Sequence, residues 1–182
     1  MMPFLQTPLY LWGFMGSGKS ALGRRLAREW ALPFYETDAM VEVRAAETIS
    51  NIFRDKGEPQ FRSYECEVLH SIPTNEPAIV ATGGGLPCFE DNAEWMLQHG
   101  LTLFLALSTE ELAARLERSH TARPLLREKR GNELRSHIQQ MLELREPIYR
   151  KAHIAIDANL ASPEYLCSIL MDYATLKLGL SK

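Results

Sequence analysis

Short apolar runs alternate with segments of helical periodicity along this chain of 182 residues. Between the first two runs, Leu22, Leu26 and Trp30 recur at the spacing of one helix face. Strands that alternate with helices in this order predict a three-layer α/β/α fold with a five-stranded parallel sheet. The apolar runs that predict buried strands lie at residues 8–12, 33–35, 78–81, 101–107 and 154–156, and the second of these strands ends near Asp38.

The sequence also marks where several helices begin and end. Ser108 and Glu111 form a capping-box pair, and Ser162-Pro163 is a typical start for the last helix. Gly100 is a typical helix stop. We expect residues 1–182 to form a single domain, because this length suits one α/β core and the chain contains no repeat or linker. Further helices are expected at about 50–72, 89–98 and 132–146.

Residues 13–20 read Gly-Phe-Met-Gly-Ser-Gly-Lys-Ser and fill every fixed position of the phosphate-loop pattern G-x-x-x-x-G-K-[ST]. Glycines let backbone N–H groups converge on phosphate oxygens, and the helix that follows directs its positive end at them. Lys19 supplies a charge for the outer phosphates, and the Ser20 hydroxyl is a ligand for Mg²⁺. The position between a strand and a helix favours nucleotide binding over the alternative, a glycine-rich turn with a coincidental lysine.

Polar groups follow two other predicted strands, at the edge where ligands bind in sheets of this class. Asp38 follows one strand, and Gly83-Gly84-Gly85 follows the next. Asp38 is the candidate that accepts a proton from an attacking hydroxyl or orients it. Its alternative role is the N-cap of a helix that begins at Ala39. The three glycines allow close approach of a ligand to the backbone, or form a loose turn.

Arginines supply the candidate anion-binding groups. Arg62 and Arg145 would form a fork-shaped site for a carboxylate if both point into the pocket. Taken singly, each is also typical of a surface helix charge. Residues 115–130 hold six of the 20 basic residues. A loop of this kind, with Arg123 as its best-defined member, would exclude water over a triphosphate and stabilise charge on it, whereas the alternative is a solvated charge run.

Composition excludes several other classes of function. The net charge of −3 argues against bulk nucleic-acid binding. The three cysteines lie far apart and form no metal or redox motif, which favours a reduced, cytoplasmic setting. No apolar stretch is long enough to cross a bilayer, and the apolar start lacks the basic leader of a signal peptide. We therefore expect a cytoplasmic monomer without nucleic-acid or membrane partners.

An ordered set of motifs from Leu9 to about Pro163 resembles the shikimate kinase family, whose P-loop fold is like that of nucleoside monophosphate kinases. The resemblance implies ATP-dependent phosphorylation of the 3-hydroxyl of shikimate, in aromatic amino-acid biosynthesis, with Mg²⁺ as cofactor. Besides the phosphate loop, the motifs are T-D at 37–38, G-E-x-x-F-R-x-x-E at 57–65, T-G-G-G at 82–85, R-P-L-L at 123–126 and R-x-P-x-Y at 145–149.

The resemblance also implies a role for each site residue. It assigns a lid to about 115–130 and a shikimate-binding helical region to about 39–72. The residues implied for catalysis are Asp38, Lys19 and Arg123. Those implied for ATP are Gly16, Ser17, Gly18, Lys19, Ser20, Ala21, Arg118, Arg123, Asp157 and Pro163. Those implied for shikimate are Asp38, Arg62, Gly83, Gly84, Gly85 and Arg145. Those implied for the metal are Ser20 and, through water, Glu36.

One position departs from the family pattern, and three alternatives stay open. The family commonly has Asp-x-Asp where this chain has Glu36-x-Asp38. Because glutamate is one methylene longer than aspartate, the geometry of the metal site is the feature that the resemblance implies least well. Asp157 resembles the adenine loop, although Ile154–Asp157 also has the appearance of a Walker B strand. A gluconate kinase is the alternative enzyme, but G-E-x-x-F-R followed by T-G-G-G favours shikimate. A binding module without catalysis would be expected to lose Lys19, Asp38 or Arg123.

Overall fold

The computed structural model describes residues 5–119 and 129–178. Five strands form one parallel sheet in the order β2-β3-β1-β4-β5, so the first strand is central. In register, Leu11 of β1 lies between Ala81 of β3 and Leu103 of β4. The prediction of a five-stranded parallel sheet is confirmed. The strands are β1 (Leu9–Trp12), β2 (Phe34–Glu36), β3 (Ile79–Ala81), β4 (Leu101–Ala106) and β5 (Ile154–Asp157).

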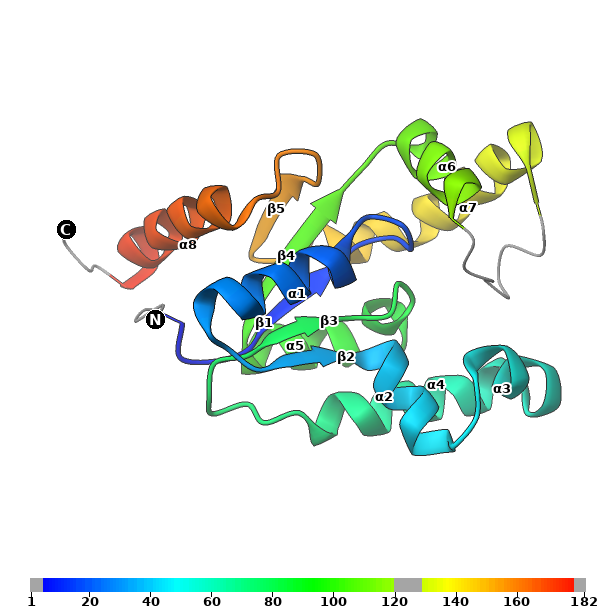
Figure 1. Ribbon diagram of the computed structural model, residues 1–182, viewed down its shortest axis with the longest axis horizontal. Coiled ribbons are helices and arrows are strands. Elements are labelled where there is room, and N and C mark those ends of the chain that lie inside the picture. The colour runs from blue at the N-terminus through cyan, green and yellow to red at the C-terminus, as the bar shows by residue number, and fades with distance from the viewer. Residues whose placement is uncertain (1–4, 120–128, 179–182) are drawn as a thin grey trace.

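Helices cover both faces of the sheet, as the three-layer prediction required (Figure 1). The first part of the chain contributes α1 (Lys19–Trp30), α2 (Thr37–Ala45), α3 (Ile49–Asp55), α4 (Gly57–Ser71) and the 3₁₀ turn η1 (Leu86–Cys88). The second part contributes α5 (Asn92–His99), α6 (Thr109–Arg118), α7 (Gly131–Tyr149) and α8 (Pro163–Leu178).

The alternation of side chains along β1 divides the core into two layers. Leu9 and Leu11 pack with apolar residues of α1 and α8 on one face. Tyr10 and Trp12 pack on the other face with residues of α4, α5 and α7. All four side chains are fully buried. Both faces of β1 are therefore covered, which is why the first apolar run shows no polar alternation.

Helices α2, α3 and α4 form a separate small cluster beside the β2 edge of the sheet (Figure 1). Its buried core consists of Val41, Ile52, Phe61 and Val68. The predicted helix over 50–72 is in fact two helices, because Gly57 has a φ of +80° and interrupts the chain between α3 and α4. This break turns α4 back along the sheet, with Arg62 among its buried residues.

Three further boundaries differ from the sequence prediction. Helix α2 begins at Thr37, and Glu36 occupies its N-cap position, so the alternative of Asp38 as a cap is wrong. Asp38 instead lies in the first turn of the helix. Helix α7 continues through Pro147 to Tyr149 and thus includes Arg145. The predicted helix at 89–98 is shorter at its start, because η1 and a turn precede α5.

The predicted helix starts at Ser108 and Ser162 are confirmed. The Ser108 hydroxyl accepts from the Glu111 N–H, and the Glu111 side chain accepts from the Ser108 backbone, which completes the capping box. The Ser162 hydroxyl accepts from the N–H of Tyr165 at 3.2 Å. Within the described ranges 5–119 and 129–178, no helix is both long enough and apolar enough to span a membrane.

Candidate active site

The phosphate loop joins the end of β1 to the start of α1. Gly18 adopts the left-handed conformation directly before the helix. The Lys19 ammonium is only 7% exposed and donates to the carbonyl oxygens of Gly13 (2.8 Å) and Phe14 (3.0 Å). The lysine side chain thereby bridges back to the start of the phosphate loop and places its positive charge inside the loop. A triphosphate at this position would lie against the N-terminus of α1 and the Lys19 charge.

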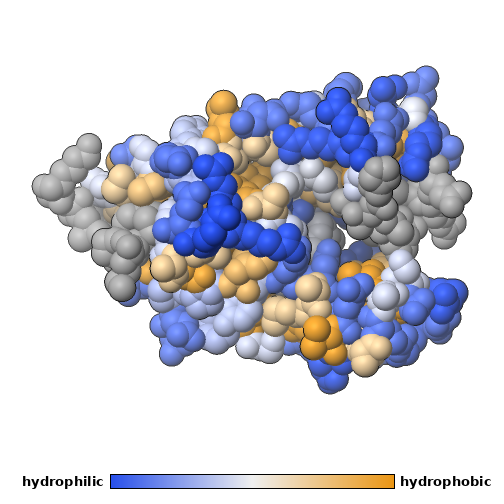
Figure 2. Space-filling model, in the orientation of Figure 1, coloured by the Kyte–Doolittle hydropathy of each residue, from blue (hydrophilic) through white to orange (hydrophobic). Residues whose placement is uncertain are grey.

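A cavity of about 630 Å³ opens at the carboxyl ends of the strands. The space-filling surface is hollowed between the α2–α4 cluster and the part that carries α6 and α7 (Figure 2). One wall is the phosphate loop with Lys19 and Ser20, and the other includes Asp38, Arg62 and the glycine loop, which we define as residues 82–85. The expectation that the groups after the first three strands open onto one crevice is therefore confirmed.

Two carboxylates meet at Gly83. A Cβ placed on this glycine would lie 2.6 Å from Asp38 Oδ1 and 2.6 Å from Glu65 Oε1, so glycine is required here for close approach. Glu65 is 1% exposed, and its Oε1 has no hydrogen-bond partner among the described residues. Burial raises the pKa of the Glu65 carboxyl to about 7, although the Arg62 charge acts to lower it. The acceptor side of the cavity thus holds one carboxyl that titrates near neutral pH.

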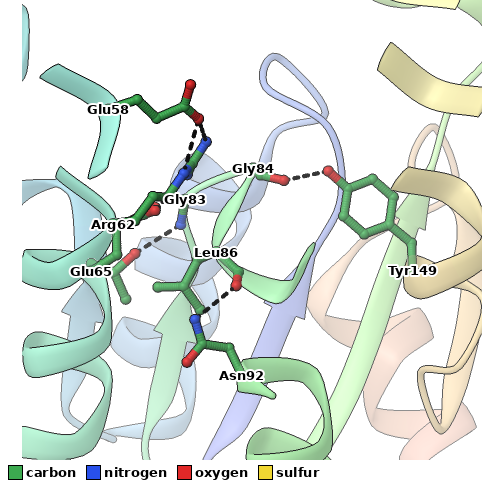
Figure 3. A network of polar contacts seen from close by, with 9 residues as sticks. Glu58, Arg62, Glu65, Gly83, Gly84, Leu86, Asn92 and Tyr149 are labelled. Carbon is green, nitrogen blue, oxygen red and sulfur yellow. Dashed lines mark hydrogen bonds and ion pairs between the residues drawn. The ribbon is translucent and has the colours of Figure 1, made fainter. Parts of the chain in front are cut away.

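Arg62 points into the protein rather than into solvent and is 6% exposed. Its guanidinium pairs with Glu65 on one side and with Glu58 at 2.6 Å on the other (Figure 3). It also lies against the glycine loop, because a Cβ on Gly85 would be 2.4 Å from Arg62 Nη1. The surface-charge alternative for Arg62 is wrong. Glu58 is half exposed, so an incoming carboxylate would compete with it for the outer edge of the guanidinium.

Arg145 presents an unsatisfied donor. Its Nη1 is buried and has no hydrogen-bond partner in the described part of the chain. The guanidinium lies over the Phe14 ring, with Cζ 5.7 Å from the ring centroid, and so reaches the phosphate-loop side of the sheet. A buried guanidinium N–H without an acceptor is costly unless a ligand supplies one. This geometry fits an anion-binding role and does not fit a solvated helix charge.

The backbone of the glycine loop is held from several elements. The Gly83 N–H donates to Thr37 Oγ1 at 2.8 Å. The Tyr149 hydroxyl donates to the Gly84 carbonyl, and Asn92 Nδ2 donates to the Leu86 carbonyl at 3.1 Å (Figure 3). These bonds come from α2, α7 and α5 respectively. The loose-turn alternative for the glycine run is therefore wrong.

At the nucleotide end, the structure singles out Arg115 of α6. Arg115 donates to the Ser17 carbonyl at 3.2 Å and to Asn159 Oδ1 at 2.8 Å. Arg118 lies exposed one turn further along the same helix. The resemblance implies an ATP-binding role for Arg118, whereas Arg115 stands out in the sequence only as part of the basic run at 115–130. The link from the phosphate loop to the loop after β5 could not be read from spacing.

Two further residues implied for ATP binding lie at the end of β5 and at the start of α8. Asp157 ends β5 and accepts from the Asn159 N–H at 2.8 Å, whereas Pro163 is buried at the start of α8. Both flank the loop that Arg115 contacts through Asn159. Arg123 and most of the predicted lid lie outside the described residues.

Glu36 forms an ion pair with Arg24 of α1, whose guanidinium lies 5.5 Å from the Phe34 ring centroid. Glu36 and Ser20 both line the cavity. Among the described residues, no group of three or more His, Cys, Asp or Glu side chains could hold a metal ion. Ser20 and Glu36 nevertheless fit Mg²⁺, because this ion keeps several waters and is held mainly by substrate phosphates with one or two protein ligands.

A model of the family described as shikimate kinase matches residues 15–174. The chain belongs to the shikimate kinase family. A shikimate kinase of Parabacteroides distasonis is 43% identical over 150 residues, which make up 82% of this chain and 87% of that relative. The family was the one predicted from the order of the motifs.

Solved structures agree with membership of the shikimate kinase family. A shikimate kinase from Acinetobacter baumannii, solved in complex with shikimate, has a TM-score of 0.81 and 31% identity over 95% of this chain and 93% of that one. A gluconokinase from Sinorhizobium meliloti has a TM-score of 0.58 and 19% identity, over 96% of this chain and 95% of that one. That second likeness shows the shared fold alone. The comparisons therefore favour a shikimate kinase over the alternative of a gluconate kinase.

Proposed function

We propose that this chain transfers the terminal phosphoryl group of ATP to the 3-hydroxyl of shikimate and releases ADP and shikimate 3-phosphate. The observation that carries the proposal is the single cavity with a phosphate loop on one wall and carboxylate, arginine and glycine groups on the other. Phosphoryl transfer needs mainly positioning and charge neutralisation. Both substrates would lie in this one cavity, donor against acceptor.

The acceptor side would hold shikimate by its carboxylate and direct one hydroxyl at ATP. Arg145 would donate to the carboxylate from its buried Nη1, which has no acceptor among the described residues. Arg62 would donate from the edge of its guanidinium that now pairs with Glu58. Asp38 then accepts a hydrogen bond from the attacking hydroxyl and takes its proton or fixes its direction. The backbone of Gly83 to Gly85 allows the ring to approach closely.

The donor side would hold the triphosphate on the phosphate loop, residues 16–21, with Lys19 on the outer phosphates. Mg²⁺ would be held by Ser20, phosphate oxygens and water, and it supplies charge neutralisation for the phosphoryl group. Glu36 is tied to Arg24 and would act on the metal only through water. We assign the base end of ATP to Arg115 together with the loop between Asp157 and Pro163. Arg123 stays a prediction from the sequence.

A coupled assay of ADP release tests this function directly. The purified chain is incubated with MgATP and, in parallel, with shikimate, quinate or gluconate. ADP release that depends on shikimate is the expected result, because Arg62 in the cavity wall and the unsatisfied Nη1 of Arg145 would bind a carboxylate, and Asp38 in the same wall would accept from a hydroxyl. Equal background release with all three acids would contradict the proposal, and release with gluconate alone would favour the other sugar-acid kinase.

Replacement of Arg145 by lysine is expected to raise the KM for shikimate about tenfold. Lysine keeps the charge but loses the planar fork that binds a carboxylate through two parallel hydrogen bonds. Steady-state kinetics with shikimate as the varied substrate measure the effect. Arg150→Lys is the matched control, since Arg150 lies on the exposed end of the same helix region and pairs only with Glu146 among the described residues. An unchanged KM for Arg145→Lys would place Arg145 outside the pocket.

We also infer a monomer that works in the cytoplasm. Among the described residues, the large apolar side chains with high exposure are spread over α2, α7, α8 and the loop before α8. The three cysteines form no disulfide and are partly buried, which suits a reducing compartment. Gel filtration with light scattering is expected to give a mass near the 20.7 kDa of the chain. A stable dimer across a range of protein concentrations would overturn this expectation.

A further inference from the structure

Tyr149 ends the R-x-P-x-Y motif, and the proposed function gives it no role. It is the last residue of α7, one helical turn after Arg145. Its ring is fully buried and packs on Phe104 of β4, with ring centroids 5.2 Å apart. Its hydroxyl donates to the Gly84 carbonyl. The end of α7 is therefore bonded to the middle of the glycine loop, as Figure 3 shows.

Arg145 and Tyr149 lie four residues apart on α7, so their side chains are neighbours on one face of the helix. Burial raises the pKa of the Tyr149 phenol above its usual value, and the nearby Arg145 guanidinium acts to lower it. The phenol is therefore protonated throughout the neutral range and remains a donor to Gly84. Tyr149 thus bonds to the backbone that the proposed function places against shikimate, and it neighbours on α7 the arginine that the proposed function places on the carboxylate.

Gly84 is also the point where the acceptor side meets the donor side. A Cβ on Gly84 would lie 3.1 Å from the Met15 nitrogen and 3.5 Å from the Gly13 oxygen, so the glycine loop packs directly on the phosphate loop. Movement of the Gly84 peptide would change the distance between the two substrates. A group that fixes this peptide would therefore preorganise both the binding of shikimate and its alignment with ATP.

We propose that Tyr149 is a positioning residue for the acceptor substrate, and that its hydroxyl sets Arg145 and the glycine loop in one fixed arrangement. This inference rests on the proposed function, because it assigns shikimate to the groups that Tyr149 holds. Tyr149 itself does not contact the reacting atoms. Its effect on shikimate is exerted through Gly84 and Arg145.

The test compares two substitutions that each remove one buried hydroxyl. Tyr149→Phe keeps the ring that packs on Phe104 and removes only the oxygen. Tyr10→Phe is the matched control, because Tyr10 is equally buried in the same core layer and its hydroxyl has no hydrogen-bond partner among the described residues. Calorimetric titration with shikimate, without nucleotide, gives the dissociation constant for each variant. Melting temperatures record any loss of stability.

Tyr149→Phe is expected to weaken shikimate binding about fivefold to tenfold and to leave the KM for ATP within twofold of wild type. Tyr10→Phe is expected to change neither. Amide exchange over residues 82–88 is expected to speed up in Tyr149→Phe, which gives a readout independent of turnover. Wild-type affinity for shikimate in Tyr149→Phe, with a lower melting temperature alone, would reduce Tyr149 to a structural residue and overturn the inference.

A double-substitution cycle tests whether Tyr149 acts through Arg145. If it does, Tyr149→Phe combined with Arg145→Lys weakens binding by less than the product of the two single effects. A combined effect equal to that product would overturn the link to Arg145. Failure of wild-type protein to bind shikimate would instead contradict the proposed function, so the two failures are distinguishable.

Discussion

Replacement of Asp38 by asparagine is expected to lower kcat about a thousandfold while ATP still binds. Asparagine keeps the size of the side chain but cannot accept a proton, and general-base or orienting groups of this kind contribute about 10²- to 10⁴-fold. Asp38 lies on the acceptor wall of the cavity, beside Gly83 and Glu65. The loss is therefore expected in turnover, whereas nucleotide binding depends on the opposite wall.

Rapid-quench measurement of a single turnover, with fluorescent-nucleotide titration in parallel, separates chemistry from binding for Asp38→Asn. Asp55→Asn is the matched control on the neighbouring helix α3, where the carboxylate is exposed and pairs with Arg54. Its kcat is expected to stay within twofold of wild type. Turnover by Asp38→Asn near the wild-type rate would remove Asp38 from the mechanism, and a parallel loss of ATP affinity would assign it to the donor side.

The sheet and the phosphate loop could be predicted because their determinants are local. A four-residue apolar run followed by G-x-x-x-x-G-K-[ST] specifies a strand, a loop and a helix in sequence. The side-chain alternation at Leu9, Tyr10, Leu11 and Trp12 was less informative, since both faces are buried and every position is apolar or aromatic. Local patterns therefore gave the order of elements and the edge at which ligands would bind.

Helix boundaries near the site were less predictable, because tertiary packing decides them. Pro147 is a typical helix breaker, yet α7 runs through it to Tyr149. The ring of Tyr149 is anchored on Phe104, and its hydroxyl is bonded to Gly84, both distant in sequence. These contacts hold the last turn of the helix in place. Because Phe104 and Gly84 lie far from Tyr149 in the sequence, the R-x-P-x-Y motif alone does not indicate what Tyr149 contacts.

The electrostatic partners of the site arginines differ in how far they could be predicted from the sequence. The partners of Arg62 are local, because Glu58 and Glu65 lie four positions before and three positions after it on one helix. The partners of Arg115 are distant in sequence, since only the fold brings Ser17 and Asn159 to this side chain. Helical spacing could therefore predict the partners of Arg62, whereas no local pattern could predict those of Arg115.

Replacement of Gly85 by alanine is expected to raise the KM for shikimate about a hundredfold with little change in the KM for ATP. Gly85 has a φ of −92° and a ψ of −18°, which alanine adopts without strain. The added methyl would instead lie 2.4 Å from Arg62 Nη1 and 2.8 Å from Nη2, closer than carbon and nitrogen can approach. The substitution therefore acts on one guanidinium and leaves the backbone conformation alone.

Arg62 cannot move away from this methyl group without a large cost in free energy. Its guanidinium is held between Glu58 and Glu65 and is almost fully buried, so displacement breaks at least one of the two ion pairs. Loss of the charge-assisted hydrogen bonds from Arg62 to a carboxylate would cost about 1.5–3 kcal/mol, which is on the order of tenfold to a hundredfold in affinity. Steady-state kinetics with each substrate varied in turn, together with calorimetric titration of shikimate, measure the loss.

Gly131→Ala is the control that separates this contact from general damage to the fold. Gly131 has a φ of +54°, so alanine there carries backbone strain of about 1–2 kcal/mol, yet an added methyl would meet none of the described atoms within 4 Å. Gly131→Ala is expected to lower the melting temperature and to keep the KM for shikimate. Because Gly85→Ala adds a clash without backbone strain, equal kinetics for the two variants would show that Arg62 does not bind the acceptor.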